Sequence, residues 1–546
     1  MLVAHAVGRA LADLGVGACF GVVGSGNFHA TNALREAGVP FFAARHEAGA
    51  ATMADAYARV SGRVSVLSVH QGCGLTNAMT GIAEAAKSRT PMVVLAAEAT
   101  APRSNFGVDQ PALAAAVGAV SERVRSSHSA VADATRAWRR ASIERRTVLL
   151  NLPLDVQAAE LPENDFDLPS VPPPAVPGPS PASVELLADV LVRAQRPVFV
   201  AGRGAVLSGA RDALVALAER CGALLGTSAV AKGLFAREPW ELDVIGGFAT
   251  PLAAELVGQA DVLVAWGCSL TMWTTRHGRL IGPAATVVQV DVDPEAIGAQ
   301  QRVGLGVVGD VSHTARAVLA AMGGRPPGGW RDDALRSRLA AQRRWRDVAY
   351  DDETGGGRID PRTLTIALDD LLPAERVVAV DSGNFMGYPA MFLSVPDERG
   401  FCFTQSFQSV GLGLATAIGA AIAFPGRLPV AALGDGGLLM AASELETVAR
   451  LGLPMLVVVY DDAAYGAEVH HFGPGGHPLD IVQFPDTDLA AIARGYGFEA
   501  ATVREPADLQ PVRAWLDRKP DRPMLVDAKV TRDRPSWWLE EAFRGH

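Results

Sequence analysis

Short apolar runs alternate with helical patterns along the whole chain. Examples are VSVLSV (64–69), DVLVAWG (261–267) and PMLVVVYDD (454–462). Strands that are apolar on both faces and separated by helices are typical of parallel sheets covered on both sides. The pattern therefore predicts an α/β protein built from doubly wound parallel sheets.

Two stretches interrupt this alternation. Residues 161–183 are too rich in proline for a helix or a central strand, which predicts an extended linker. The second interruption runs from GGRPPGGW (323–330) to DDETGGGRIDP (351–361). A chain of 546 residues suggests about three domains, and we expect them at 1–165, 184–322 and 358–546.

Composition narrows the class of partner. The net charge is −10 and no long run of Lys or Arg occurs, which argues against a nucleic-acid or anionic-membrane surface. No segment approaches the ~20 apolar residues of a membrane span, and the first residues do not read as a signal peptide. The five cysteines form no CxxC pair. These features predict a cytoplasmic protein that acts on small molecules.

Gly, Asp, Ser and Asn residues cluster where predicted strands end. In open parallel sheets the ligand sits at the carboxyl ends of the strands. The clusters are GVVGSGN (21–27), SVHQGCGLTN (68–77), VDSGN (380–384), LGDGG (433–437) and VYDDAAYG (459–466). These segments are the candidate site.

One cluster suggests a metal bound to phosphate. Gly434–Gly437 turns from a predicted strand into a predicted helix over 438–452, and a helix N-terminus attracts phosphate. Asp435 would repel that phosphate unless a hard cation such as Mg²⁺ joined them. The next strand brings Asp461 and Asp462 to the same edge. The alternative is that Asp462 caps a helix and Asp461 is solvated.

The spacing of these aspartates carries a family resemblance. A GDG, the 24 residues 437–460, and then Asp-Asp followed by AAYG resemble the signature of thiamine diphosphate enzymes. The resemblance implies that Asp435, Asp462 and the backbone carbonyl of Ala464 hold Mg²⁺ against the diphosphate. Asp462 stands where the family usually has Asn. The other motif residues implied to contact the cofactor are Gly434, Gly436, Gly437, Tyr465 and Gly466.

A second segment would serve the aminopyrimidine ring of the cofactor. Glu47 begins an Ala-rich helical pattern, and a glutamate in apolar surroundings has the raised pKa that suits proton exchange with a ring nitrogen. The alternative is a first-turn glutamate favoured by the helix dipole. The string ARHEAGA (44–50) resembles the acetolactate synthase branch, as does 68–98, which contains Asn77 and has Cys73 in place of a proline.

The resemblance covers most of the chain and implies further contacts. Gly383 and Asn384 would face the diphosphate, the backbone of Gln408 would meet the 4′-amino group, and Val410 would bend the cofactor into a V shape. The family commonly has a Gly-rich run where this chain has QSFQS (405–409). The resemblance also implies a homodimer or homotetramer with active sites at the dimer interface.

Other residues are candidates for substrate chemistry. His70 resembles a proton-moving histidine of benzoylformate decarboxylase, with a backbone-bonded histidine as the alternative. Glu468 is a possible acid/base group, whereas His470 and His471 are expected at the surface or in a lid. The remaining expected substrate contacts are Asn27, Phe28 and Gln110. The tryptophans of RPSWWLEEAF (534–543) would close the site, contact another subunit or join the core.

The central block adds one open question. Its GxG at Gly202–Gly204 lacks the full dinucleotide spacing, so FAD is the less favoured alternative to a structural domain. The leading functional hypothesis is a carboligase that decarboxylates a 2-oxo acid and ligates the enamine to a carbonyl acceptor. The alternatives are a non-oxidative 2-oxo acid decarboxylase that releases an aldehyde and a catalytically retired, cofactor-binding homologue.

Overall fold

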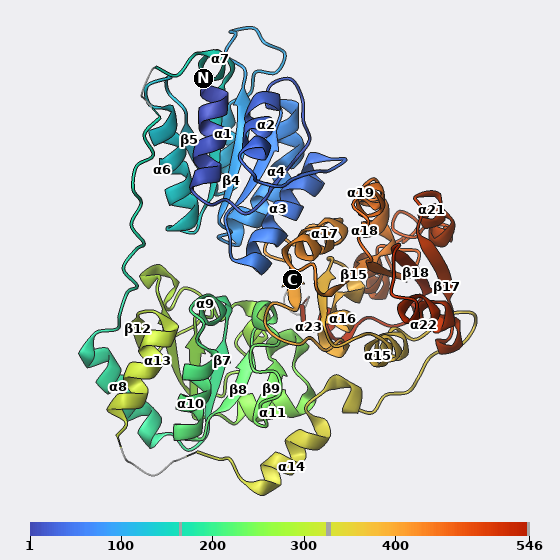
Figure 1. Ribbon diagram of the computed structural model, residues 1–546. Helices are drawn as coiled ribbons and strands as arrows, with labels where there is room; N and C mark the ends of the chain where they lie inside the picture. Colours follow the sequence, from blue (N-terminus) through green and yellow to red (C-terminus); the bar gives the residue numbers. More distant parts are fainter. Residues whose placement is uncertain (163–165, 324–328, 543–546) are drawn as a thin grey trace.

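The computed structural model describes residues 1–162, 166–323 and 329–542. Its strands form three six-stranded sheets in which all neighbouring strands are parallel. Helices flank each sheet, and the three units appear as three lobes in Figure 1. The predicted α/β fold class is therefore confirmed.

The N-terminal sheet has the strand order β2-β1-β3-β4-β6-β5. Strand β3 is buried along its whole length, including Ser65 and Ser68, as expected of a strand covered on both faces. The strands are β1 (Cys19–Gly21), β2 (Phe41–Ala43), β3 (Ser65–Val69), β4 (Met92–Glu98), β5 (Val120–Arg123) and β6 (Thr147–Pro153). The helices are α1 (Val3–Asp13), α2 (Phe28–Glu36), α3 (Glu47–Ser61), α4 (Cys73–Lys87), α5 (Gln110–Ala116), α6 (Ala130–Ser142) and α7 (Leu154–Ala158).

The central sheet has the order β12-β11-β10-β7-β8-β9. The proline-rich segment before it contains no helix or strand among its described residues until α8 begins at Pro181. The strands are β7 (Pro197–Ala201), β8 (Leu224–Thr227), β9 (Glu241–Val244), β10 (Val262–Trp266), β11 (Thr286–Asp291) and β12 (Leu305–Val308). The helices are α8 (Pro181–Arg193), α9 (Arg203–Leu207), α10 (Arg211–Cys221), α11 (Pro251–Gly258), α12 (Met272–Thr275), α13 (Val311–Ala321) and α14 (Asp333–Gln342).

The C-terminal sheet has the order β14-β13-β15-β16-β18-β17. Its strands are β13 (Arg376–Val380), β14 (Phe401–Phe403), β15 (Leu428–Gly434), β16 (Leu456–Asp461), β17 (Glu499–Val503) and β18 (Met524–Lys529). The helices are α15 (Pro361–Leu371), α16 (Gly387–Phe392), α17 (Gly413–Ala423), α18 (Asp435–Met440), α19 (Glu444–Arg450), α20 (Gly466–Phe472), α21 (Leu489–Gly495), α22 (Gln510–Asp517) and α23 (Trp537–Ala542).

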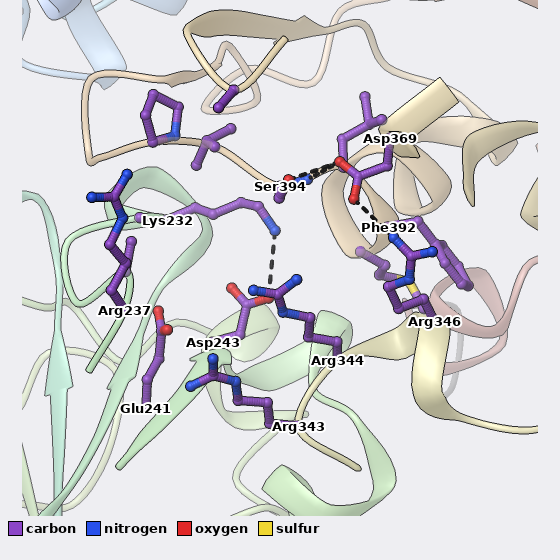
Figure 2. Close-up of a pocket in the computed structure, with 17 residues that line it drawn as sticks. Lys232, Arg237, Glu241, Asp243, Arg343, Arg344, Arg346, Asp369, Phe392 and Ser394 are labelled. Atoms are coloured by element: carbon purple, nitrogen blue, oxygen red, sulfur yellow. Dashed lines mark hydrogen bonds and ion pairs between the residues drawn. The ribbon is translucent and has the colours of Figure 1, made fainter. Parts of the chain in front are cut away.

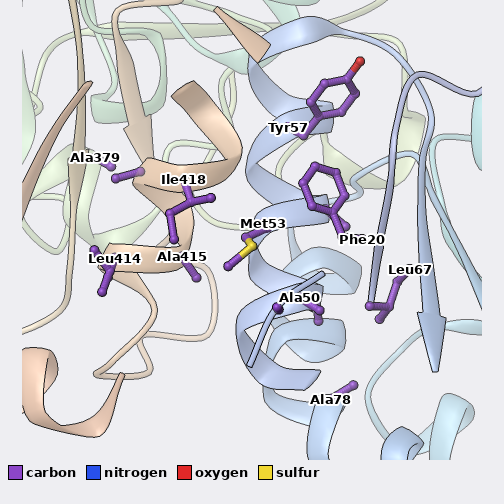
Figure 3. Packing of buried hydrophobic residues seen from close by; sticks show 14 of the residues in the cluster. Phe20, Ala50, Met53, Tyr57, Leu67, Ala78, Ala379, Leu414, Ala415 and Ile418 are labelled. Carbon is purple, nitrogen blue, oxygen red and sulfur yellow. The ribbon is translucent and has the colours of Figure 1, made fainter. Parts of the chain in front are cut away.

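The N-terminal and C-terminal units share one hydrophobic core. Helix α3 crosses helix α17, and Met53 lies against Ala415 and Ile418 in this packing (Figure 3). The crossing is close because a Cβ atom on Gly419 would lie 2.3 Å from the carbonyl oxygen of Met53. Any larger residue at position 419 would force the two helices apart.

The prediction of a single helix over 438–452 is wrong. The structure divides it into α18 and α19, with a turn in between. The turn aims the Glu444 carboxylate at the N-terminal unit, where Oε1 accepts hydrogen bonds from the backbone N–H groups of Arg45 (3.1 Å) and His46 (3.0 Å). The turn between α18 and α19 therefore occurs together with a contact to residues far away in the sequence. The local spacing of apolar residues cannot predict such a contact.

Candidate functional site

The C-terminal sheet has a cavity at the carboxyl ends of its strands. After β13 the chain leaves to one side, to β14, and after β15 to the other, so these two strands form the switch point where open α/β sheets bind ligands. The cavity, which we call the edge cavity, has a volume of about 450 Å³. Its lining includes the predicted residues Gly383, Asn384, Gln408, Val410, Gly434, Asp435, Gly436, Gly437, Asp462, Ala464, Tyr465, Gly466 and Glu468.

Two carboxyl groups meet at this cavity. Burial, together with the nearby Asp462 carboxylate, raises the pKa of Asp435 to about 8. Burial and the neighbouring Asp461 raise the pKa of Asp462 to about 7. A cation stabilises the ionised forms of two buried carboxyl groups whose pKa values are raised, so the pair suits a divalent metal.

The neighbouring Asp461 belongs to a different interaction. Its side chain is buried, and its Oδ2 lies 2.6 Å from the Nζ of Lys529. The alternative of a solvated Asp461 is therefore wrong. Asp462 accepts a hydrogen bond from the backbone N–H of Ala464 (3.2 Å), whereas α20 begins four residues later, at Gly466, without a side-chain cap. Asp462 is thus not the cap of α20.

Small residues leave room for a ligand at this edge. A Cβ atom on Gly437 would lie 2.3 Å from Oδ2 of Asp381, and one on Gly466 would lie 2.2 Å from Oδ2 of Asp462. Side chains at these positions would displace the acidic groups, so glycine keeps the backbone open beside them. The glycines and the acidic pair fit a diphosphate held through a hard cation. No cluster of three or more metal-ligating side chains occurs among the described residues, and a diphosphate would have to complete the coordination.

The loop that carries Gln408 and Val410 is held by a residue that the sequence did not single out. Asp381 is buried, and its carboxylate accepts hydrogen bonds from the backbone N–H groups of Gly411 (3.0 Å) and Leu412 (3.2 Å). Burial raises the pKa of Asp381 to about 6. Gln408 has a φ of 60°, a left-handed conformation that is uncommon for a residue with a side chain. Asp381 follows a predicted strand, and that position was the only signal available for it.

The same loop is also held from the N-terminal unit. Glu84 on α4 is fully buried, and its carboxylate accepts hydrogen bonds from the backbone N–H groups of Ser406 (3.0 Å) and Phe407 (2.6 Å). Arg59 donates to the same carboxylate at 2.7 Å and also to the backbone carbonyl of Phe403 (3.1 Å). A buried ion pair therefore fixes the loop across the contact between the two units.

We expect Glu84→Gln to lower the free energy of unfolding by about 1–3 kcal/mol, because one buried backbone donor loses its acceptor. Cofactor affinity should fall as well, since the loop at 406–408 is released. Urea unfolding and calorimetric titration with thiamine diphosphate measure the two effects. Glu255→Gln is the control, because Glu255 forms an exposed pair with Arg338 that is worth less than about 1 kcal/mol. Equal losses in both variants would contradict the role of Glu84.

Glu47 does not line the edge cavity of its own chain. It begins helix α3, is half-buried, and accepts a hydrogen bond from Nδ2 of Asn77 at 3.1 Å. Both residues follow the carboxyl edge of the N-terminal sheet. The structure thus brings Glu47 and Asn77 together but leaves them outside the cavity that holds Asp435 and Asp462.

His70 follows β3 and is hydrogen-bonded to the backbone, which was the predicted alternative to a proton-moving histidine. Its Nδ1 accepts a hydrogen bond from the backbone N–H of Gly26 at 3.2 Å, and its ring packs edge-on against Phe106. No described residue forms a hydrogen bond with its Nε2 atom, so the bond to Nδ1 orients the ring and leaves Nε2 open to other contacts.

The three expected substrate contacts lie apart from the edge cavity. Asn27 is buried and bonds Ser68 (3.0 Å) and the carbonyl of Val22. Gln110 is buried and donates to the carbonyl of Ala97 at 2.8 Å. Only Phe28 is exposed, with 51% of its surface accessible. The two buried amides hold loops of the N-terminal unit in place.

The chain end and α20 complete the cavity wall. Trp538 lines the edge cavity and donates from its indole N–H to the backbone carbonyl of Asn384 at 2.9 Å. Trp537 packs instead against Trp345. On α20, Glu468 lines the cavity, whereas burial lowers the pKa of His470, which does not line it. The tail therefore both joins the core and covers the site, and the sequence had left these choices open.

The glycine pair of the central sheet is packed against its own backbone. The N–H of Gly204 donates to the carbonyl of Gly267 at 2.9 Å, and a Cβ atom on Gly202 would lie 2.3 Å from that oxygen. The intervening Arg203 is directed at the N-terminal unit, where it donates to the carbonyl of Ser88. These glycines therefore serve a close approach of β7 and β10.

The raised pKa values predict a pH effect on the metal-free protein. Free aspartate has a pKa near about 3.9, so the folded state holds more protons than the unfolded state up to about pH 8. The contribution of Asp435 and Asp462 to the free energy of unfolding should therefore decrease as the pH rises from about 4 to 8 and stay level above that. Melting curves of chelator-treated protein test this against the Asp435→Asn/Asp462→Asn double variant. Identical pH profiles for the two proteins would refute the effect.

No helix among the described residues is long and apolar enough to cross a membrane.

The chain matches the thiamine pyrophosphate enzyme family in three places. These are the N-terminal TPP binding domain at residues 1–118, the central domain at 184–318 and the C-terminal TPP binding domain at 381–528. The C-terminal match includes the edge cavity residues from Gly383 to Glu468.

Similar proteins span nearly the same length. A sulfoacetaldehyde acetyltransferase of Alcaligenes xylosoxydans xylosoxydans is 30% identical over 560 residues, covering 95% of this chain and 91% of the relative. A probable 2-ketoarginine decarboxylase of Pseudomonas aeruginosa is 30% identical, covering 92% and 89%. A probable acetolactate synthase large subunit of Methanocaldococcus jannaschii is 26% identical, covering 93% and 88%. With three matched domains and a site that suits a diphosphate, the chain belongs to the thiamine pyrophosphate enzyme family and is a thiamine diphosphate-dependent enzyme.

Proposed function

We propose that this chain is a Mg²⁺-dependent carboligase that decarboxylates a 2-oxo acid and joins the remaining carbon unit to a carbonyl acceptor. The observation that carries the proposal is the meeting of Asp435 and Asp462 in the edge cavity, beside glycines that leave the backbone open. The names of two relatives, a probable acetolactate synthase and a sulfoacetaldehyde acetyltransferase, denote enzymes that join or transfer a carbon unit.

Different residues of the chain would hold the metal, the diphosphate and the rest of the cofactor. Asp435, Asp462 and the carbonyl of Ala464 would hold Mg²⁺, and Gly436 and Gly437 would let backbone N–H groups approach the diphosphate. When bound, thiamine diphosphate supplies an electron sink for the bond that breaks in decarboxylation. Val410 would hold the cofactor in its bent shape.

Glu47 would exchange a proton between its carboxyl oxygen and a ring nitrogen of the aminopyrimidine. Asn77 orients that carboxylate through the 3.1 Å hydrogen bond to Oε2. Because Glu47 lies outside the edge cavity of its own chain, we propose that a second copy of the chain supplies it. A dimer is then the smallest active unit.

Trp538 and Leu539 line one side of the edge cavity. Their burial of apolar surface there would exclude water from the substrate, which favours joining of two carbon units over release of the first to solvent.

The reaction is tested by incubating the holoenzyme with pyruvate, with and without an aldehyde acceptor. The carboligase proposal predicts a hydroxyketone that contains both carbon units, and it requires that free aldehyde be the minor product. If pyruvate gives only free aldehyde and no coupled product in the presence of an acceptor, ligation is the wrong reaction. The Glu47→Gln protein serves as the blank for uncatalysed coupling.

A simple decarboxylase is the second candidate. The observation in its favour is Glu468, which lines the edge cavity from α20 and would serve as a proton donor there. The probable 2-ketoarginine decarboxylase among the relatives adds to this. Glu468→Gln separates the two reactions, because loss of the acid should reduce aldehyde release and leave ligation to a carbonyl acceptor less affected.

A further inference from the structure

A second cavity lies between the central and C-terminal units and shares no lining residue with the edge cavity. Its volume is about 270 Å³. The walls come from the β8–β9 connection and β9, from the segment after α14, and from the end of α16 with the residues that follow it (Figure 2). We call it the arginine pocket.

The described walls of the arginine pocket carry more positive than negative charge. Five basic and three acidic side chains line it. Two of the basic groups are occupied: Lys232 lies 3.6 Å from Asp243, and Arg346 lies 3.5 Å from Asp369. Dashed lines mark both pairs in Figure 2, together with the hydrogen bond from Ser394 to Asp369.

Three guanidinium groups of the pocket form no ion pair with a carboxylate among the described residues, although Arg343 and Arg344 lie within electrostatic reach of Glu241. Arg343 donates only to the backbone carbonyl of Glu238 (3.0 Å), and the side chains of Arg237 and Arg344 make no hydrogen bond or ion pair with a described residue. A guanidinium presents a fork of donors that matches the oxygens of phosphate or carboxylate. Three guanidinium groups that form no ion pair and line one cavity favour the binding of an anion with several oxygens.

A buried acid at the same cavity points to the same class of ligand. Only 9% of the surface of Glu241 is exposed, and its carboxyl group makes no hydrogen bond or ion pair with a described residue. Burial and the neighbouring Asp243 raise the pKa of Glu241 to about 8. The charges of Arg343, Lys232 and Arg344 act against this rise, whereas burial and Asp243 favour the neutral carboxyl group, which repels an anion less than a carboxylate does.

We propose that the arginine pocket binds a small phosphate dianion through Arg237, Arg343 and Arg344. The pocket is smaller than the cavities of about 300–1,000 Å³ that hold drug-sized ligands, so inorganic phosphate or a short phosphate monoester fits and a nucleotide does not.

The position of the pocket gives such a ligand a structural effect. It contacts both the central and the C-terminal unit, and a ligand that binds only the folded chain stabilises it. Residues 384–386 line the edge cavity and continue directly into α16, whose last residues, Met391 and Phe392, line the arginine pocket. Occupation of one cavity therefore acts on a helix that also borders the other.

The test uses the holoenzyme saturated with thiamine diphosphate and Mg²⁺, so that the edge cavity is closed to phosphate. Calorimetric titration with inorganic phosphate at fixed ionic strength should give one site per chain. Arg344→Gln and Arg237→Gln should each weaken this binding at least about tenfold, since each removes a charged donor. Arg336→Gln is the control, because it removes the same charge from the exposed face of α14 and should bind phosphate as the wild type does.

Further arms identify the ligand. Glycerol phosphate in place of inorganic phosphate tests whether the pocket accepts an ester, and malonate tests a dicarboxylate. Absence of phosphate binding at millimolar concentration, or equal binding by the wild type, Arg237→Gln and Arg344→Gln, would overturn the proposal. Tighter binding of malonate than of either phosphate compound would also overturn it, because the pocket would then select a different anion.

Discussion

Replacement of Glu47 by Gln is expected to reduce turnover by at least about 10²–10⁴-fold, the usual contribution of a positioned general acid or base. The glutamine side chain has nearly the same size and still accepts a hydrogen bond from Asn77, whose Nδ2 lies 3.1 Å from Oε2 of Glu47. It does not exchange a proton with the aminopyrimidine. Activity should therefore be lost without loss of the fold.

The measurement that separates this role from a structural one is cofactor binding. Thiamine diphosphate should bind Glu47→Gln with nearly wild-type affinity, because the metal and diphosphate contacts lie in the edge cavity. Glu144→Gln, on the exposed surface of the same unit, should retain full activity. Full activity of Glu47→Gln would refute the mechanism proposed for Glu47.

The two aspartates of the edge cavity are expected to respond differently to the same change. Asp435→Asn should weaken Mg²⁺-dependent cofactor binding by more than about 100-fold, because even a residue that only supports a metal ligand typically contributes 10–100-fold. Asp462→Asn should retain cofactor binding, since an amide oxygen remains available and is the ligand that the family usually has.

The Asp462→Asn variant should also show a change in pH dependence. The Asp462 carboxylate is one cause of the raised pKa of Asp435, so its removal should let Asp435 ionise and bind the metal at a lower pH. Titrations of the cofactor at several pH values in the presence of Mg²⁺ measure this shift. If Asp462→Asn loses both Mg²⁺ and the cofactor, this site depends on an acidic ligand at position 462.

The fold class could be predicted from the sequence because the burial of a strand determines the local pattern of apolar and polar residues. Strands such as β7 and β10, which are buried along their whole length, have no polar positions to interrupt their apolar runs. The GDG turn was recognisable for a similar reason: glycine beside a buried strand and ahead of a helix is a local requirement for an approaching phosphate. Such features need only neighbours in the chain.

The break between α18 and α19 was not predictable in this way. The helical pattern continues through it, and what accompanies the turn is the contact of Glu444 with the backbone of Arg45 and His46, about 400 positions earlier. Asn27 and Gln110 illustrate the same limit, because the sequence marked them as loop amides but only the packing of the N-terminal unit shows that their side chains are buried.

By itself, then, the sequence determined the alternating α/β architecture, the cofactor family and the acidic pair of the edge cavity, because each depends on residues close together in the chain. The tertiary structure alone decided which groups support that pair. Lys529 neutralises Asp461, Asp381 holds the loop of Val410, and Glu84 fixes the same loop from another unit. Buried charges require partners, and these partners come from whichever segment the packing brings near, so the sequence could not reveal them.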